Sequence, residues 1–238
     1  MDKQFKIFVD FDGTITKKDV GDAIFQEFGI REEVDTIISD LLSDKISAKE
    51  CWLLLCGSIK DFEVKKINEF IDNIEIDSTF HGFNEYCIKN GFDVFILSDG
   101  FDYYINRIFD REKLSDIKVF CNKLTITSDR FIPEFPYEDE DCRTSANCKR
   151  NHIISSSSDE DFTFYIGDGN SDKHPAQYCD FIFAKKSLLK FCEKERITYF
   201  PYKDFNDIIK KLQELKNKKR LKKRHQAVLK RRERYMIE

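Results

Sequence analysis

Acidic residues follow three short apolar runs of the chain. The first run, Phe5–Asp10, leads into Asp10-Phe-Asp-Gly-Thr-Ile-Thr16, the second ends in Leu97-Ser-Asp-Gly100, and the third leads into Gly167-Asp-Gly-Asn-Ser-Asp172. Short apolar runs of this kind are typical of buried parallel strands, and ligand sites lie beyond the carboxyl ends of such strands. The sequence therefore predicts one site built from these three acidic turns.

A basic pair, Lys149 and Arg150, lies between the second and third patterns. Together the four segments resemble the motifs of the haloacid dehalogenase (HAD) superfamily. The resemblance implies that Asp10 is a nucleophile that becomes phospho-aspartate, and that Asp12 protonates the leaving alcohol and then activates water. Dehalogenases of the superfamily lack this second aspartate, so the pattern favours a phosphatase. Solvated turns are the alternative interpretation of the motifs.

The resemblance also implies a magnesium ion and a set of phosphate contacts. Mg²⁺ prefers oxygen ligands, which Asp10, the backbone carbonyl of Asp12 and Asp168 could provide. Asp172 would hold either a water ligand of the metal or Lys149. Lys149 would neutralise the charge that develops near phosphorus, with Arg150 as the competing candidate. Ser98 and the backbone N–H groups around Asp99 and Gly100 would bind the phosphoryl oxygens.

The elements that must position these residues alternate between strand and helix. Strands are expected at Phe5–Asp10, Asp93–Leu97, Ile117–Phe120, Phe162–Ile166 and Asp180–Phe183, with helices between them, including one over Asp172–Tyr178. A hairpin or irregular excursion is expected over Leu124–Phe135. This alternation predicts an α/β fold with a doubly wound, Rossmann-like parallel sheet.

Residues 19–76 break the alternation, because their apolar residues recur only at helical spacing. We expect an α/β core at 1–16 and 78–215, and a small helical cap inserted after the first strand at 17–77. Such a cap resembles that of phosphoserine-phosphatase-like HAD members and would set specificity for a small soluble phosphomonoester. Asp19 is either a substrate contact or the N-cap of a helix, and Arg31 is either a carboxylate ligand or a solvated helix charge.

Further segments resemble the methionine-salvage branch of these phosphatases, whose named member acts on 2-hydroxy-3-keto-5-methylthiopentenyl 1-phosphate. They are Cys142–Ile154, Tyr165-Ile-Gly-Asp168, Ala176-x-x-x-Asp180-x-x-Phe183-Ala184, Leu188–Cys192 and Pro201–Ile208. Phosphoserine phosphatase and phosphotransferase activities are the alternatives, as is a protein that only binds. Cys142 and Cys148, with Cys121 and His152, could hold zinc or could be ordinary loop cysteines.

The charge of the chain is divided between its body and its tail. Residues 216–238 contain 11 Lys/Arg and 2 Asp/Glu, a net charge of +9, whereas the formal charge of the whole chain is −4. We expect a basic tail at 216–238, helical or disordered, that continues a helix from residue 205. It could bind an anionic partner or help a homodimer form, but nucleic acid is the weaker candidate because few aromatic residues are interleaved.

No apolar run approaches the ~20 residues that span a bilayer. We place the protein in the cytoplasm, without a membrane partner.

Overall fold

The computed structural model describes residues 4–143 and 145–235. The chain divides into two compact units, which are described separately. Unit 1 contains 4–15, 76–97 and 149–235, and unit 2 contains 16–75 and 98–148. This division differs from the expected one, because residues 98–148 group with the helical insert instead of with the rest of the strands and helices.

The strands follow the order β4-β3-β2-β1-β5-β6-β7. In unit 1 the register is parallel throughout: Asp10 pairs with Leu97, Val9 with Ile166, and Gly167 with Ala184. The expected parallel sheet is therefore confirmed for this part, and the carboxyl ends of β1, β2, β5 and β6 lie at one edge. The bounds are β1 Phe5–Asp10, β2 Asp93–Phe101, β5 Phe162–Gly167, β6 Phe181–Ala184 and β7 Phe200–Pro201.

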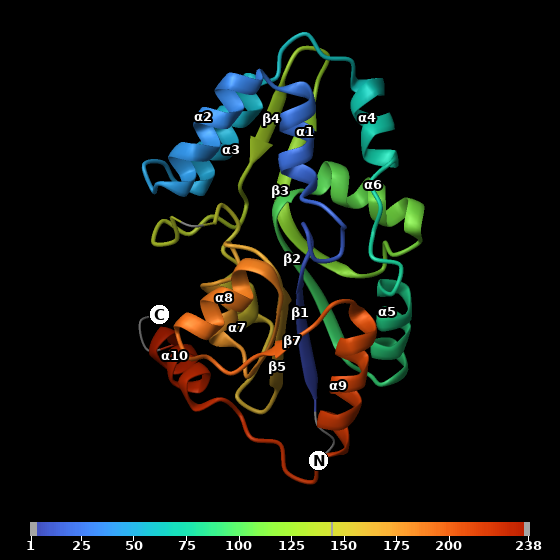
Figure 1. Cartoon of the computed structure of the whole chain (residues 1–238), viewed down its shortest axis with the longest axis vertical. Coiled ribbons are helices and arrows are strands. Elements are labelled where there is room, and N and C mark those ends of the chain that lie inside the picture. The colour runs from blue at the N-terminus through green and yellow to red at the C-terminus, as the bar shows by residue number, and fades with distance from the viewer. Residues whose placement is uncertain (1–3, 144, 236–238) are drawn as a thin grey trace. The chain divides into compact units, whose positions relative to one another are not determined.

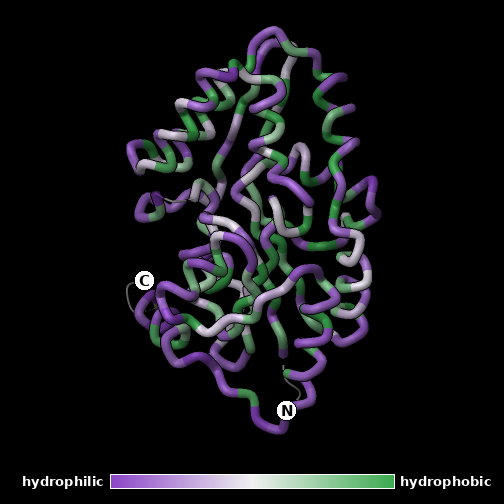
Figure 2. Tube along the Cα trace, in the orientation of Figure 1, coloured by the Kyte–Doolittle hydropathy of each residue, from purple (hydrophilic) through white to green (hydrophobic). Residues whose placement is uncertain are grey.

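Helices cover both faces of the strands of unit 1. In Figure 1, α5 (Phe80–Lys89) and α9 (Phe205–Asn217) lie together on one side of β1, and α7 (Lys149–Ser155), α8 (Lys186–Lys194) and α10 (His225–Tyr235) lie on the other. The strands between them are largely hydrophobic, whereas the connection between α9 and α10 is mostly hydrophilic (Figure 2). Phenylalanine rings fill the strand layer, for example Phe5 against Phe92 and Phe164 at centroid distances of 4.6 Å.

Two helix predictions in unit 1 were wrong in extent. The segment Asp172–Tyr178 forms only a 3-10 turn, η1 (Pro175–Tyr178), because Pro175 has no N–H to donate and the Asp172 carboxylate binds backbone N–H groups on its N-terminal side. The helix expected from residue 205 ends at Asn217, and the basic tail, expected to be helical or disordered, is helical only from His225 after a non-helical segment at 218–224. Its second part, α10, is not a solvated tail, because its Arg231 side chain is buried beside Asp180.

Unit 2 contains the helical insert after β1, as expected. Its helices are α1 (Val20–Phe28), α2 (Arg31–Leu42), α3 (Ala48–Ser58) and α4 (Val64–Asp72), followed after β2 by α6 (Asp102–Glu112). The expected hairpin is confirmed, because β3 (Lys118–Ile126) and β4 (Phe131–Glu134) pair antiparallel. Arg111 donates to the carbonyls of Ile71, Asp72 and Ile74, so α6 satisfies the backbone at the end of α4.

Candidate active site

Asp10 is the last residue of β1 and is buried. Asp12, two residues further on, lies half-buried in the turn that follows. Gly13 has a φ of 75°, and a Cβ at this position would lie 2.7 Å from Asp168 Oδ2. Only glycine allows the turn to pass so close to this carboxylate. The turn after β1 and the turn after β5 therefore bring Asp10 and Asp168 to the same edge of the sheet.

Lys149 supplies the positive charge beside Asp10. It is the first residue of α7, its side chain is 1% exposed, and its Nζ lies 2.6 Å from Asp10 Oδ1 and 2.8 Å from Asp172 Oδ1. The Ser171 hydroxyl is a third neighbour at 3.1 Å. Arg150, the competing candidate, is also buried, but its Nε donates to the side chain of Asn151. The geometry therefore favours Lys149 over Arg150.

Asp172 is engaged through both carboxylate oxygens. Oδ1 accepts hydrogen bonds from Lys149 Nζ and from the Tyr165 hydroxyl, which lies 2.7 Å away. Oδ2 accepts from the backbone N–H groups of Asp168 and Gly169. A carboxylate offers about four lone-pair sites, and these four donors occupy that number. Of the two roles expected for Asp172, holding Lys149 is thus the one that its contacts favour.

A group of buried carboxylates suits a divalent cation. One ligand oxygen each from Asp10, Asp168 and Asp172 lies within 4.8 Å of the others. Asp168 Oδ1 also accepts a hydrogen bond from the Thr14 hydroxyl at 3.2 Å, and Asp168 Oδ2 forms an ion pair with Lys186 Nζ at 2.7 Å. Hard oxygen donors in a compact acidic group match the preference of Mg²⁺, so the residues fit the expected metal. Since Asp172 is saturated by donors, Asp10 and Asp168 are the better direct ligands.

The electrostatics of this group are unfavourable without an added cation. Burial, followed by repulsion from Asp172 and Asp168, raises the pKa of Asp10 well above its ordinary value, and Lys149 only partly opposes this. Burial also works against the charge of Lys149, but Asp10 and Asp172 outweigh it and raise the pKa of the ammonium. The pKa of Asp172 is lowered despite its burial, because Lys149 and the Gly169 N–H stabilise its charge. The three carboxylates thus have one buried ammonium, that of Lys149, and one largely exposed ammonium, that of Lys186 beside Asp168.

The predicted phosphate loop, Ser98–Gly100, is the last part of strand β2, which runs to Phe101 and so beyond its expected end at Leu97. Ser98 follows Leu97, the register partner of Asp10, and belongs to unit 2. Its buried hydroxyl accepts a hydrogen bond from the Gly100 N–H at 2.9 Å. The Asp99 carboxylate instead contacts protein groups, among them Ser145 Oγ and the Asn147 N–H, both at 2.8 Å. The phosphate contacts expected here stay a prediction, and only backbone groups would supply them at Asp99.

The structure also shows the surroundings of Asp19, Arg31 and the cysteines Cys142 and Cys148. Asp19 is the N-cap of α1 and accepts a hydrogen bond from the Asp22 N–H, so the capping role is present while the substrate contact stays a prediction. Arg31 is an exposed first residue of α2. Cys142 and Cys148 belong to no group of three metal-ligating side chains, because the one such group found within 4–143 and 145–235 is the aspartate cluster. The zinc hypothesis therefore finds no support.

Two residues near the cluster were missed from the sequence. Lys186 follows β6, and its ammonium lies 2.7 Å from Asp168 Oδ2. The sequence does contain an indication of this contact, because the pair Lys185-Lys186 directly follows a strand that ends at the same edge of the sheet. Tyr165 is part of a predicted buried strand and of a family-like motif, but strand periodicity does not show that its hydroxyl group donates a hydrogen bond to Asp172.

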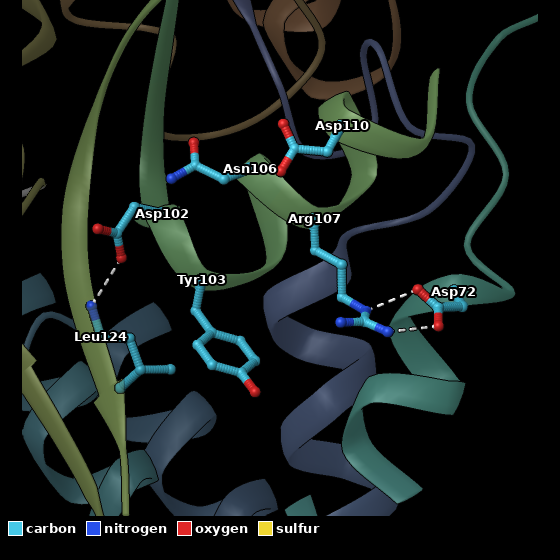
Figure 3. A pocket seen from close by; sticks show the side chains of 7 residues that line it. All are labelled: Asp72, Asp102, Tyr103, Asn106, Arg107, Asp110 and Leu124. Carbon is cyan, nitrogen blue, oxygen red and sulfur yellow. Dashed lines mark hydrogen bonds and ion pairs between the residues drawn. The ribbon is translucent and has the colours of Figure 1, made fainter. Parts of the chain in front are cut away.

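A pocket of about 560 Å³ lies in unit 2, and its lining includes none of the predicted site residues. Figure 3 shows Arg107 directed at Asp72, with both guanidinium contacts at 2.6 Å, and Asp102 directed at the backbone N–H of Leu124. These contacts join α6 to α4 and to β3. Asp72, Arg107 and Asp102 therefore have a structural explanation, and none of the lining residues belongs to the predicted catalytic set.

A sequence model of the family described as Putative Phosphatase matches residues 5–226. The chain belongs to this family. The Putative Phosphatase assignment agrees with relatives named 2-hydroxy-3-keto-5-methylthiopentenyl-1-phosphate phosphatase. One from Bacillus mycoides (strain KBAB4) is 30% identical over 219 residues, covering 88% of this chain and 96% of that protein. Another from Bacillus cytotoxicus (strain DSM 22905 / CIP 110041 / 391-98 / NVH 391-98) is 29% identical, with the same coverage.

The fold is also similar to solved structures. A substrate-bound phosphoserine phosphatase complex has a TM-score of 0.68 at 23% sequence identity, covering 89% of this chain and 99% of that chain. At this identity the likeness concerns the fold. Together with the family match, it makes this member of the Putative Phosphatase family a HAD-type phosphatase, a phosphoric monoester hydrolase. None of the helices in the described part of the chain is long and apolar enough to cross a membrane.

Proposed function

We propose that this phosphatase hydrolyses a small phosphorylated metabolite in a Mg²⁺-dependent reaction, through a phospho-aspartate on Asp10. The observation that carries the proposal is the buried Lys149 ammonium, which lies 2.6 Å from Asp10 and 2.8 Å from Asp172 beside the metal-suited aspartates. A lysine held in this way keeps Asp10 oriented and offsets charge at the site where a phosphoryl dianion must approach.

The first step forms a bond between a carboxylate oxygen of Asp10 and phosphorus. The bond from phosphorus to the ester oxygen breaks, and Asp12 gives its proton to the departing alkoxide. In the second step Asp12, now a carboxylate, takes a proton from a water molecule whose oxygen attacks phosphorus. This breaks the phospho-aspartate bond, releases inorganic phosphate and restores Asp10. A bound Mg²⁺, held by Asp10 and Asp168, would supply additional positive charge to the phosphoryl oxygens.

The other residues of the chain act by positioning. Asp172 fixes Lys149, and its contacts with the Asp168 and Gly169 N–H groups hold the turn that carries Asp168. The Ser98 hydroxyl would donate a hydrogen bond to a phosphoryl oxygen. The helical insert at 17–77 would act as a cap that determines which ester enters the site. These roles remain proposals, and the similarity to capped phosphatases supports them.

A methionine-salvage-like substrate is the favoured class, because the relatives at about 30% identity are named 2-hydroxy-3-keto-5-methylthiopentenyl-1-phosphate phosphatase and match over nearly their whole length. Phosphoserine is the second candidate, since the fold resembles phosphoserine phosphatases. Transfer of the phosphoryl group to an acceptor other than water is the third.

The test is phosphate release from a panel of phosphomonoesters, which includes 2-hydroxy-3-keto-5-methylthiopentenyl 1-phosphate and phosphoserine, with and without Mg²⁺. Wild type, Asp10→Asn and Asp93→Asn would be compared. Asp93 is a matched control because it lies at the amino end of β2, where it pairs with Lys6. We expect Mg²⁺-dependent release by wild type and the control, and none by Asp10→Asn. An active Asp10→Asn protein would refute the mechanism, and a phosphorylated acceptor among the products would replace hydrolysis by transfer.

A further inference from the structure

The Asp99 carboxylate is a junction between separate segments of unit 2. Its Oδ1 lies 2.8 Å from both the Ser145 hydroxyl and the Asn147 N–H. Its Oδ2 accepts a hydrogen bond from the indole Nε1 of Trp52 at 3.3 Å, and Trp52 belongs to helix α3 of the insert. One side chain therefore joins the insert, the end of β2 and the segment that precedes α7.

The same segment also holds Ser98. Asn147 Nδ2 donates to the backbone carbonyl of Ser98 at 2.7 Å and to that of Phe120 at 2.9 Å. Asn122, a residue of strand β3, donates through Nδ2 to the carbonyl of Asp99 at 2.6 Å, so β3 also holds the phosphate loop in place. Asn147 and Asn122 are both fully buried. These hydrogen bonds restrain the loop, because a shift of Ser98 or Asp99 would break hydrogen bonds from the buried amides of Asn147 and Asn122.

Trp52 is held tightly where it meets this network. Its ring packs against Phe101, the last residue of β2, at a centroid distance of 4.9 Å, and against Phe25 of α1 at 5.8 Å. A Cβ on Gly21 would lie 2.8 Å from the ring, so α1 can approach only because this position is glycine. Trp52 thus combines contacts to the helices of the insert with contacts to both Asp99 and Phe101 on β2.

We propose that Asp99 is a positioning residue that couples the insert to the phosphate loop through Trp52, and does not itself bind substrate through its carboxylate. This rests on the proposed function, since Ser98 is assigned to the phosphate there. A movement of α3 pulls on Asp99, and Asp99 is covalently joined to Ser98. Substrate held by the insert and phosphate held by the loop therefore stabilise the same arrangement of this junction.

The first test uses fluorescence, because Trp52 is the only tryptophan of the chain. In Asp99→Asn the amide oxygen can still accept from Ser145 and Asn147, which leaves the amide NH₂ facing the indole N–H and removes that hydrogen bond. We expect the Trp52 emission of the ligand-free protein to change in Asp99→Asn and to stay unchanged in Asp72→Asn, a control whose carboxylate pairs with Arg107 in the same unit. An emission identical to wild type in Asp99→Asn would overturn the contact, whatever the enzyme's activity.

The second test uses steady-state kinetics of Trp52→Phe, Asp99→Asn and the double variant on the best substrate. Each single change removes the same hydrogen bond, so we expect KM to rise about tenfold in both, the factor for one hydrogen bond to a charged group. We expect kcat to change less than KM, and the double variant to be no worse than the single ones.

Independent, additive losses would show that Asp99 and Trp52 act separately and would overturn the coupling. A large effect of Asp99→Asn with Trp52→Phe at the wild-type KM would assign Asp99 to substrate contact instead. If wild type hydrolyses no ester, the proposed function fails, whereas the emission comparison still decides whether the junction exists.

Discussion

The Lys149 ammonium lies 2.6 Å from Asp10 Oδ1, with both side chains buried, and the same nitrogen lies 2.8 Å from Asp172. One lysine therefore forms ion pairs with two carboxylates. With Asp168 the group carries more negative than positive charge. Such an arrangement stores unfavourable electrostatic energy in the metal-free protein, which substitutions in the group or added Mg²⁺ should change.

Replacing Lys149 by Met should abolish activity and destabilise the fold. The change leaves buried carboxylates without their cation, which typically costs about 3–5 kcal/mol. Lys6→Met is the control, because its ion pair with Asp93 is more exposed and should contribute about 0–1 kcal/mol. Urea unfolding at neutral pH without metal measures both. Equal stability losses in the two variants would contradict the buried Lys149 geometry.

Asp10→Asn should make the metal-free protein more stable while it removes activity. The pKa of Asp10 is raised by burial and by its acidic neighbours, so the stability that goes with its neutral form is lost as the pH rises through its folded pKa. The variant should match wild type most closely below the ordinary pKa of 3.8 and exceed it at higher pH. Urea unfolding across pH tests this, and a difference independent of pH would contradict it.

Mg²⁺ should stabilise wild type and not Asp10→Asn. A ligand at about 100 times its Kd adds roughly 2.7 kcal/mol to the free energy of unfolding when it binds only the folded state. Thermal unfolding with and without Mg²⁺ measures the effect, with Asp93→Asn as the control that keeps it. An equal rise of the Tm in Asp10→Asn would show that the ion binds elsewhere.

Lys186→Met should tighten Mg²⁺ binding. The Lys186 ammonium lies 2.7 Å from Asp168 Oδ2, where it competes with a metal for the same carboxylate. Because its side chain is 60% exposed, the gain should be modest, about two- to fivefold in Kd. Calorimetric titration with Mg²⁺ measures this, and Lys190→Met, an exposed lysine of the same helix, is the control. Weaker binding in Lys186→Met would disprove the competition.

Arg231→Met should destabilise the protein much more than Arg232→Met. Arg231 is buried, pairs with Asp180 at 3.2 Å and donates to the carbonyl of Tyr178. Its loss leaves the buried Asp180 carboxylate without its ion-pair partner, with hydrogen bonds, among the described residues, only from Thr163, at a cost of about 3–5 kcal/mol. Arg232 makes an exposed ion pair with Asp159 and should contribute about 0–1 kcal/mol. Urea unfolding of the full chain compares them, and similar midpoints would show that α10 is not anchored through Arg231.

Periodicity and motif spacing predicted most of the local structure. The apolar runs before Asp10 and Asp168 become β1 and β5, and helical spacing after Thr16 becomes α1 to α4, because burial of one face dictates both patterns. Local sequence failed at Asp172–Tyr178, where a carboxylate that binds backbone N–H groups and a proline replace the helix with a turn.

The sequence by itself determined the family chemistry, since two aspartates at fixed spacing after a strand need no tertiary information to be recognised. Only the tertiary structure showed that Lys149, and not Arg150, pairs with Asp10 and Asp172. It also showed that the Asp99 carboxylate is engaged by protein groups and that Arg231 is buried. The reason is physical. A strand or helix is fixed by neighbours a few residues away, whereas an ion pair between residues 139 positions apart, such as Asp10 and Lys149, exists only once parallel strands bring their ends to one edge.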